Sequence, residues 1–106
     1  HASRESLTVK VEVYEGEQSV VLPCQYRQVL ENILTVKWSR YDLNPNTVHQ
    51  QQEGDDLHSQ NQLFKGRTSM TPLDSGDFNL TLKKPKLSDS GNYTCSIIDD
   101  EGEKKL

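Results

Sequence analysis

Apolar and polar side chains alternate along short segments of this chain, and turn-forming residues separate one segment from the next. An alternation with a period of two is typical of β-strands that bury one face. No segment shows sustained helical periodicity with caps. Closely spaced short strands of this kind predict an all-β fold, a two-sheet antiparallel sandwich. We expect strands over residues 7–13, 20–26, 34–39, 64–70, 78–83 and 93–98, a polar strand over 47–52, and the start of a last strand at 103–106.

Length and composition limit the chain to one small domain with a thin core. The 106 residues (1–106) suffice for a single domain, and only 32% of them are hydrophobic. The formal net charge of −4 argues against binding to nucleic acid, because contacts with phosphates rely on clustered Lys and Arg. No run of about 18 apolar residues occurs, so we expect no membrane span and no direct contact of this domain with a membrane.

The two cysteines and two glycosylation sequons point to an oxidising compartment. Cys24 and Cys95 are too few for a structural zinc site. If paired, they close a loop of about 70 residues, which stabilises the fold by about 4 kcal/mol in the chain-entropy model. The alternative is a pair of buried free thiols in a cytosolic protein. The sequons at Asn79 and Asn92, together with the thin core, favour a secreted or cell-surface protein.

A constellation of residues resembles the immunoglobulin superfamily, variable type. It consists of Cys24, Trp38 fourteen residues later, and the run from Asp89 to Cys95 (D-S-G-N-Y-T-C). The resemblance implies an inter-sheet disulfide between Cys24 and Cys95, with Trp38 packed against it. It further implies a tyrosine corner, an ion pair and a core residue, which would be Tyr93, Arg67 with Asp89, and Leu87 respectively.

Residues 48–70 narrow the resemblance to the B7, butyrophilin and myelin-glycoprotein group. Residues 48–56 and the run Q-N-Q-L-F-K-G-R-T (60–68) look like the C′ strand, Gly-Asp turn and short following strand of that group. The chain shows no Phe-Gly-x-Gly or Trp-Gly-x-Gly bulge of antigen receptors after Gly102. It ends at Leu106, before the last strand is expected to finish, so we expect that strand to be truncated.

We expect no enzyme, because no acid, base and nucleophile converge in a known catalytic motif. His1 lies at the terminus, and His49 and His58 flank a turn where we expect them to face solvent. The acidic run 99–101 lacks the spacing of an EF-hand calcium loop, and we interpret it as a hairpin tip. We therefore predict no catalytic residues, no cofactor and no metal site.

The remaining function is recognition of another protein. The resemblance implies that the sheet of strands C, C′, F and G is the contact face. Outward parity places five candidate partner-binding residues there, namely Lys37, Ser39, Tyr41, Ser96 and Ile98. A glycan at Asn79 would cover the other sheet, and one at Asn92 would lie near the lower edge of the contact face.

Our leading hypothesis is an extracellular recognition domain of a cell-surface immune receptor or ligand. It would bind another cell-surface protein to regulate immune-cell activation, in the extracellular part of a plasma-membrane protein or in a secreted one. One alternative is a homophilic cell-adhesion module, which would form a weak homodimer through the same face. A second alternative is an antigen-receptor-like variable chain.

Overall fold

The computed structural model describes residues 7–14, 16–24, 33–52, 54–55, 57–70, 78–99 and 102–105. This part of the chain contains nine β-strands and two short 3₁₀ helices. For residues 7, 33–34, 52, 54–55, 98–99 and 102–105 only the backbone is described. None of the helices in these ranges has the length and apolar character needed to cross a membrane. The elements are β1 (Leu7–Val11), β2 (Ser19–Leu22), β3 (Ile33–Ser39), β4 (Thr47–Gln52), β5 (Gly54–Asp55), η1 (Gln62–Phe64), β6 (Thr68–Met70), β7 (Leu80–Lys83), η3 (Leu87–Asp89), β8 (Gly91–Asp99) and β9 (Gly102–Lys105).

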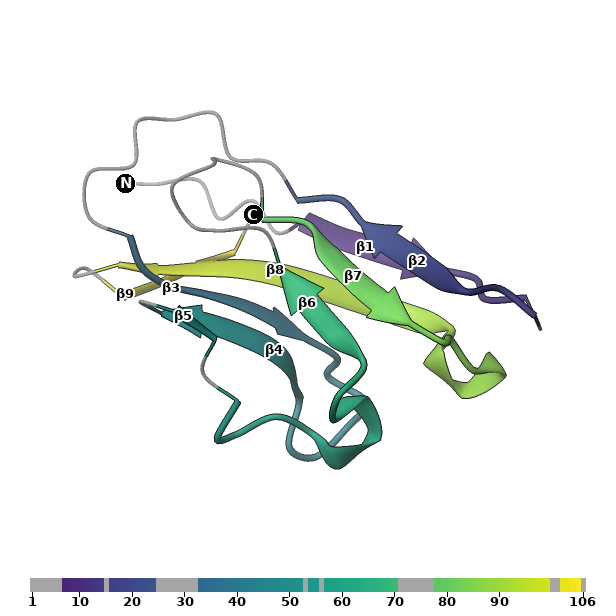
Figure 1. Cartoon of the computed structure of the whole chain (residues 1–106). Helices are drawn as coiled ribbons and strands as arrows, with labels where there is room; N and C mark the ends of the chain where they lie inside the picture. Colours follow the sequence, from purple (N-terminus) through teal and green to yellow (C-terminus); the bar gives the residue numbers. More distant parts are fainter. Residues whose placement is uncertain are drawn as a thin grey trace.

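The strands pair antiparallel into two sheets, which form two layers in Figure 1. The larger sheet has the order β1-β8-β3-β4-β5, with β9 also paired to β8, and the smaller has the order β2-β7-β6. The predicted all-β sandwich is confirmed, and the polar segment 47–52 is the strand β4.

The core lies between the two layers and is built from the inward-facing side chains of both sheets. Period-two alternation explains this, because every second residue of a strand points to the same face. The buried hydrophobic side chains are Val11, Val13, Leu22, Cys24, Val36, Trp38, Val48, Phe64, Phe78, Leu80, Leu82, Tyr93, Cys95 and Ile97.

A disulfide joins the two layers at the centre of this core. Cys24 follows β2 and Cys95 lies in β8, and their Cα atoms are 6.5 Å apart. The predicted pairing is therefore confirmed. Trp38 pairs with Cys95 across β3 and β8, is fully buried, and donates from Nε1 to the carbonyl oxygen of Phe78 at 2.8 Å.

Strand β8 shares one of its edges between two partners. Its first half, Gly91 to Cys95, pairs with β1, and its second half, Ser96 to Asp99, pairs with β9. Its other edge pairs with β3. The longest strand of the larger sheet is therefore held by three neighbours.

Three expectations about the elements need correction. Residues 64–70 are not one strand: η1 ends at Phe64, a turn with Gly66 at φ 75° follows, and β6 begins only at Thr68. Strand β3 ends at Ser39, so Tyr41 lies in the turn that follows it. The segment 20–26 is a strand only as far as Leu22. His1, Tyr26, Asp100, Glu101 and Leu106 lie outside the described residues.

Candidate functional site

The predicted contact face is the outward side of the larger sheet. Strand register places Lys37 of β3 between Gln50 of β4 and Ser96 of β8. Both Lys37 and Gln50 are half-buried, whereas the other outward residues are almost completely covered. We call this set the outer face, and it consists of Thr35, Lys37, Ser39, Gln50, Thr94 and Ser96.

Ser39 and Ser96 do not offer the contact surface that the sequence predicts. They lie at outward positions, but they are only 2% and 0% exposed. Both side chains are short and stand between residues of neighbouring strands: Ser96 lies opposite Lys37, and Ser39 lies between Thr47 and Thr94. Outward parity therefore gives the direction of these two side chains correctly and their accessibility wrongly.

The hydroxyl groups of this face are only partly hydrogen-bonded. The hydroxyl of Ser39 lies 3.5 Å from the carbonyl oxygen of Thr94, and the hydroxyls of Thr94 and Thr8 are 3.4 Å apart. Oγ of Ser96 is buried and has no hydrogen-bond partner in the described structure. Such an atom is unusual in a folded protein, where most buried polar groups are paired.

Tyr41 is the most accessible of the predicted contact residues. It lies in the turn after β3, at the end of the outer face, and its side chain is 56% exposed. The side chain of Ile98 lies outside the described residues, although its backbone pairs with Thr35 and with Glu103. The structure therefore brings Lys37 and Tyr41 to the surface of one sheet and its adjoining turn.

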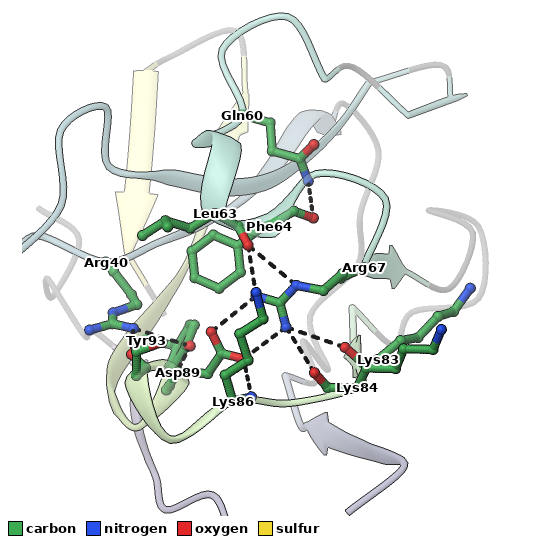
Figure 2. A network of polar contacts seen from close by, with 11 residues as sticks. Arg40, Gln60, Leu63, Phe64, Arg67, Lys83, Lys84, Lys86, Asp89 and Tyr93 are labelled. Carbon is green, nitrogen blue, oxygen red and sulfur yellow. Dashed lines mark hydrogen bonds and ion pairs between the residues drawn. The ribbon is translucent and has the colours of Figure 1, made fainter.

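An ion pair joins Arg67, which directly precedes β6, to Asp89 at the end of η3. Nη1 and Nη2 of Arg67 donate to Oδ2 and Oδ1 of Asp89 at 2.8 and 3.1 Å (Figure 2). The backbone N–H of Lys86 donates to the same carboxylate at 2.8 Å. Burial would raise the pKa of Asp89, but these hydrogen bonds outweigh it and hold the pKa below its ordinary value.

A second arginine, Arg40, is buried beside this pair, and sequence reasoning missed it. Its guanidinium lies 5.2 Å from the ring centroid of Tyr93, donates to the carbonyl oxygen of Ser88 at 3.1 Å, and holds both carboxylate oxygens of Asp42. These bonds lower the pKa of Asp42. Strand parity could have predicted that Arg40 faces inward, because it lies two residues after the inward-facing Trp38. Asp42, two residues further on, could have been predicted as its acidic partner.

Tyr93 connects these two arginine clusters. Its hydroxyl donates to the carbonyl oxygen of Asp89 at 2.5 Å, which is the geometry of a tyrosine corner. Its ring meets Phe64 edge-on at a centroid distance of 6.2 Å. Burial raises the pKa of Tyr93 above its ordinary value, although Arg40 opposes the shift.

Leu87 is not the core residue that the resemblance implies, because its side chain is 63% exposed. The turn that contains it is the 3₁₀ helix η3, in which successive side chains are about 120° apart. Asp89 points inward to Arg67, so Leu87, two residues earlier, points outward. Pro85 takes a buried position in this segment instead.

The two sequon asparagines differ in accessibility. Asn92 is exposed at the start of β8 and pairs with Lys10 of β1. Asn79 is half-buried, and its Oδ1 accepts a hydrogen bond from the backbone N–H of Cys24 at 2.9 Å. Of these two asparagines, only Asn92 therefore has an exposed side chain in the folded chain.

The histidines and carboxylates do not converge on a chemical site in the described ranges. His49 is fully buried and not solvent-facing as predicted, because β4 points it into the core beside Trp38, where its Nδ1 lies 2.7 Å from Oγ1 of Thr68. His58 is exposed, as expected. No group of three or more His, Cys, Asp or Glu that could hold a metal is found among the described residues.

Comparison with known proteins identifies relatives over nearly the whole chain. Residues 8–105 match the immunoglobulin V-set domain family. The V-set domain-containing T-cell activation inhibitor 1 of Rattus norvegicus is 33% identical over an alignment that covers 77% of this chain and 30% of that protein. The Homo sapiens protein of the same name is 29% identical, with 96% and 38% covered.

The versican core protein of Rattus norvegicus is also similar. It is 31% identical over 74% of this chain, which corresponds to 3% of its own length. The chain thus spans about a third of the T-cell activation inhibitors that it matches and a small part of versican.

Proposed function

This chain belongs to the immunoglobulin V-set family, a non-enzymatic recognition fold, and from that membership we propose that it is an extracellular recognition domain of a cell-surface immune receptor or ligand. The disulfide between Cys24 and Cys95 supports an oxidising environment. The exposed sequon at Asn92 is compatible with the same environment. No chemistry is involved, and the domain acts by surface complementarity.

The similarity to T-cell activation inhibitor 1 carries the second half of the proposal. That name describes a protein that restrains T-cell activation, and the human protein is similar over 96% of this chain. We infer that this chain binds a protein on immune cells and regulates their activation. Single contacts of this kind are weak, and several copies on a cell surface would bind by avidity.

The outer face is the surface that we assign to the partner. Lys37 supplies a half-buried cation at its centre, and Tyr41 supplies an exposed aromatic side chain at its end. Interfaces are enriched in aromatic anchors, with polar groups around them.

Tetramers of this chain, tested on immune cells, would examine both halves of the proposal. We expect them to stain activated T cells from the source organism and to change cytokine release when immobilised beside a stimulating antibody. Tyr41→Asp should weaken staining at least about tenfold, because it places a charge in an aromatic contact. The matched control is Tyr14→Asp, since Tyr14 is 65% exposed and lies outside the outer face.

Equal loss of staining with both tyrosine variants would exclude the outer face as the binding surface. Absence of staining on every immune cell type would overturn the proposed function.

Sedimentation velocity of the chain from micromolar to millimolar concentration examines the homophilic alternative. A monomer over the whole concentration range supports binding to a partner other than a second copy of this chain. A reversible dimer that Tyr41→Asp abolishes would favour self-adhesion instead.

A further inference from the structure

Three lysines form an exposed basic turn between β7 and η3. Lys83 ends β7, Lys84 follows it, and Lys86 precedes η3, with the buried Pro85 between the last two. All three side chains are exposed, and none makes a hydrogen bond or ion pair with another described residue. The turn holds three of the twelve Lys and Arg residues of a chain whose net charge is −4. In Figure 2 the side chain of Lys86 extends in another direction from those of Lys83 and Lys84.

Hydrogen bonds with Arg67 and Gln18 hold the backbone of this basic turn. The N–H of Lys83 donates to the carbonyl oxygen of Arg67 at 2.7 Å, and that of Lys84 to the carbonyl oxygen of Gln18 at 2.8 Å. The carbonyl oxygens of Lys83 and Lys84 accept from Nη1 of Arg67 at 3.3 and 3.2 Å. Figure 2 shows both lysine side chains extending together in one direction, away from Arg67.

Lys84 adopts a backbone conformation that a lysine seldom takes. Its φ is 48°, in the left-handed region that glycine and asparagine occupy most readily. A glycine would fit this position with less strain, so the lysine is not explained by the turn itself. Strained positions of this kind are concentrated at functional sites. The charged side chain is the property that glycine could not provide.

An open groove runs beside the basic turn. Its walls are Gly16, Glu17 and Gln18 on one side and Lys83, Lys84 and Pro85 on the other. The carboxylate of Glu17 already accepts the backbone N–H of Tyr14 at 2.7 Å. The groove therefore offers an extended ligand a path past the ammonium groups of Lys83 and Lys84, which pair with no residue that the structure describes.

We propose that the basic turn, Lys83, Lys84 and Lys86, binds a sulfated polysaccharide. Such a polymer is linear, carries closely spaced anions and is found outside cells, and its binding to clustered lysines releases counterions. An anionic membrane is the less suitable ligand, because polybasic membrane recognition takes clusters of about four to eight Lys and Arg. The site is separate from the outer face, and it rests on the proposed function only for the extracellular location of the domain.

Surface plasmon resonance with the whole 106-residue chain on immobilised heparan sulfate tests the proposal. We expect binding that falls steeply with added salt, and weaker binding to desulfated heparin, to hyaluronan and to phosphatidylserine vesicles. Lys83→Gln/Lys84→Gln should weaken binding to heparan sulfate at least about tenfold. The control Lys10→Glu carries the same net charge, two units below −4, and should stay within about twofold of the wild type, because Lys10 is exposed and lies outside the basic turn and the outer face.

Lys84→Gly separates binding from folding. Glycine adopts a φ of 48° without strain, so the melting temperature of Lys84→Gly should be unchanged or higher. Its binding to heparan sulfate should weaken about threefold to tenfold. Equal losses in Lys83→Gln/Lys84→Gln and in Lys10→Glu would overturn the proposal, since net charge alone would then explain the binding. Failure of the wild type to bind at physiological salt would overturn it as well, as would tighter binding to vesicles or hyaluronan than to heparan sulfate.

Discussion

Asp89 is a carboxylate at the end of η3 with only 4% of its side chain exposed, and its partners decide whether it stabilises the fold. Arg67 donates two hydrogen bonds to it, and the N–H of Lys86 donates a third. A buried charge with this many donors is tolerated, whereas a buried charge without a partner is strongly unfavourable. The ion pair is therefore sensitive to removal of either member.

We expect Arg67→Met to lower the free energy of unfolding by about 3–5 kcal/mol, because it leaves the carboxylate of Asp89 buried without its cation. Urea denaturation followed by tryptophan fluorescence measures this change. Lys65→Met, two residues earlier and exposed, should change stability by less than about 0.5 kcal/mol. A loss below about 1 kcal/mol for Arg67→Met would show that water reaches the carboxylate.

The depressed pKa of Asp89 predicts a specific dependence of stability on pH. Its folded pKa lies below the unfolded value of about 3.9, so the native state gains stability above that value and loses it as the pH falls through the folded pKa. Asp89→Asn cannot titrate and lacks this contribution. From pH 7 to pH 3 we expect urea denaturation to show a larger loss of stability in the wild type than in Asp89→Asn. Equal losses of stability in the wild type and in Asp89→Asn would contradict a lowered pKa of Asp89 in the folded state.

At the residue scale, sequence reasoning succeeded where apolar residues alternate along a strand, and it failed in a turn and in a polar strand. Trp38 faces the core because of its parity in β3, and it is fully buried. Leu87 shares the expectation of burial, but the 3₁₀ turn points it outward. His49 was expected to face solvent because it flanks a turn, but it lies within the polar strand β4, whose register turns it inward opposite Trp38.

At the scale of elements, the division of one β8 edge between β1 and β9 is the least predictable feature. Local periodicity identifies each strand, but it contains no information about which distant strand is its neighbour. Thr8 and Val9 pair with Thr94 and Tyr93, more than eighty residues away in sequence. The first half of β8 therefore depends on a strand from the other end of the chain.

We expect Thr8→Pro/Val9→Pro to release β1 from β8, because proline cannot donate to a strand ladder. Hydrogen exchange should then accelerate at those amides of residues 91–95 that point away from β3. The amides of residues 96–99, which pair with β9, should stay protected. Glu12→Pro, just beyond the end of β1, is the matched control. Loss of protection along the whole of β8, or no change, would contradict independent pairing of its two halves.

Segment 64–70 shows why a short strand and a turn can be confused in a sequence. Phe64 and Met70 have the spacing of one strand, but Gly66 adopts a φ of 75° and interrupts it. The oxygen of the Asn61 side chain caps η1 by accepting the N–H of Leu63 at 3.0 Å. Asn61 and Gly66 are turn-forming residues, so the signal was present, and hydrophobic spacing was given more weight than it deserved.

At the scale of the whole molecule, the thin core makes the covalent link between the sheets important. Hydrophobic residues form 32% of the chain, and the buried ones lie in a single layer between the two sheets. Proteins of this size are stable by about 5–15 kcal/mol in total. A disulfide that closes a loop of this length contributes about 4 kcal/mol, which is a large share of that stability.

We therefore expect Cys24→Ala/Cys95→Ala to lower the free energy of unfolding by about 4 kcal/mol and the melting temperature by more than about 15 °C. The cause is the larger conformational entropy of the unfolded chain once its 71-residue separation is no longer bridged. Calorimetry measures both quantities. Reduction of the wild type should reproduce the loss, and the reductant should leave the double variant unchanged. A loss below about 1 kcal/mol would mean that the contacts of Trp38 and its neighbours hold the two sheets together without the disulfide.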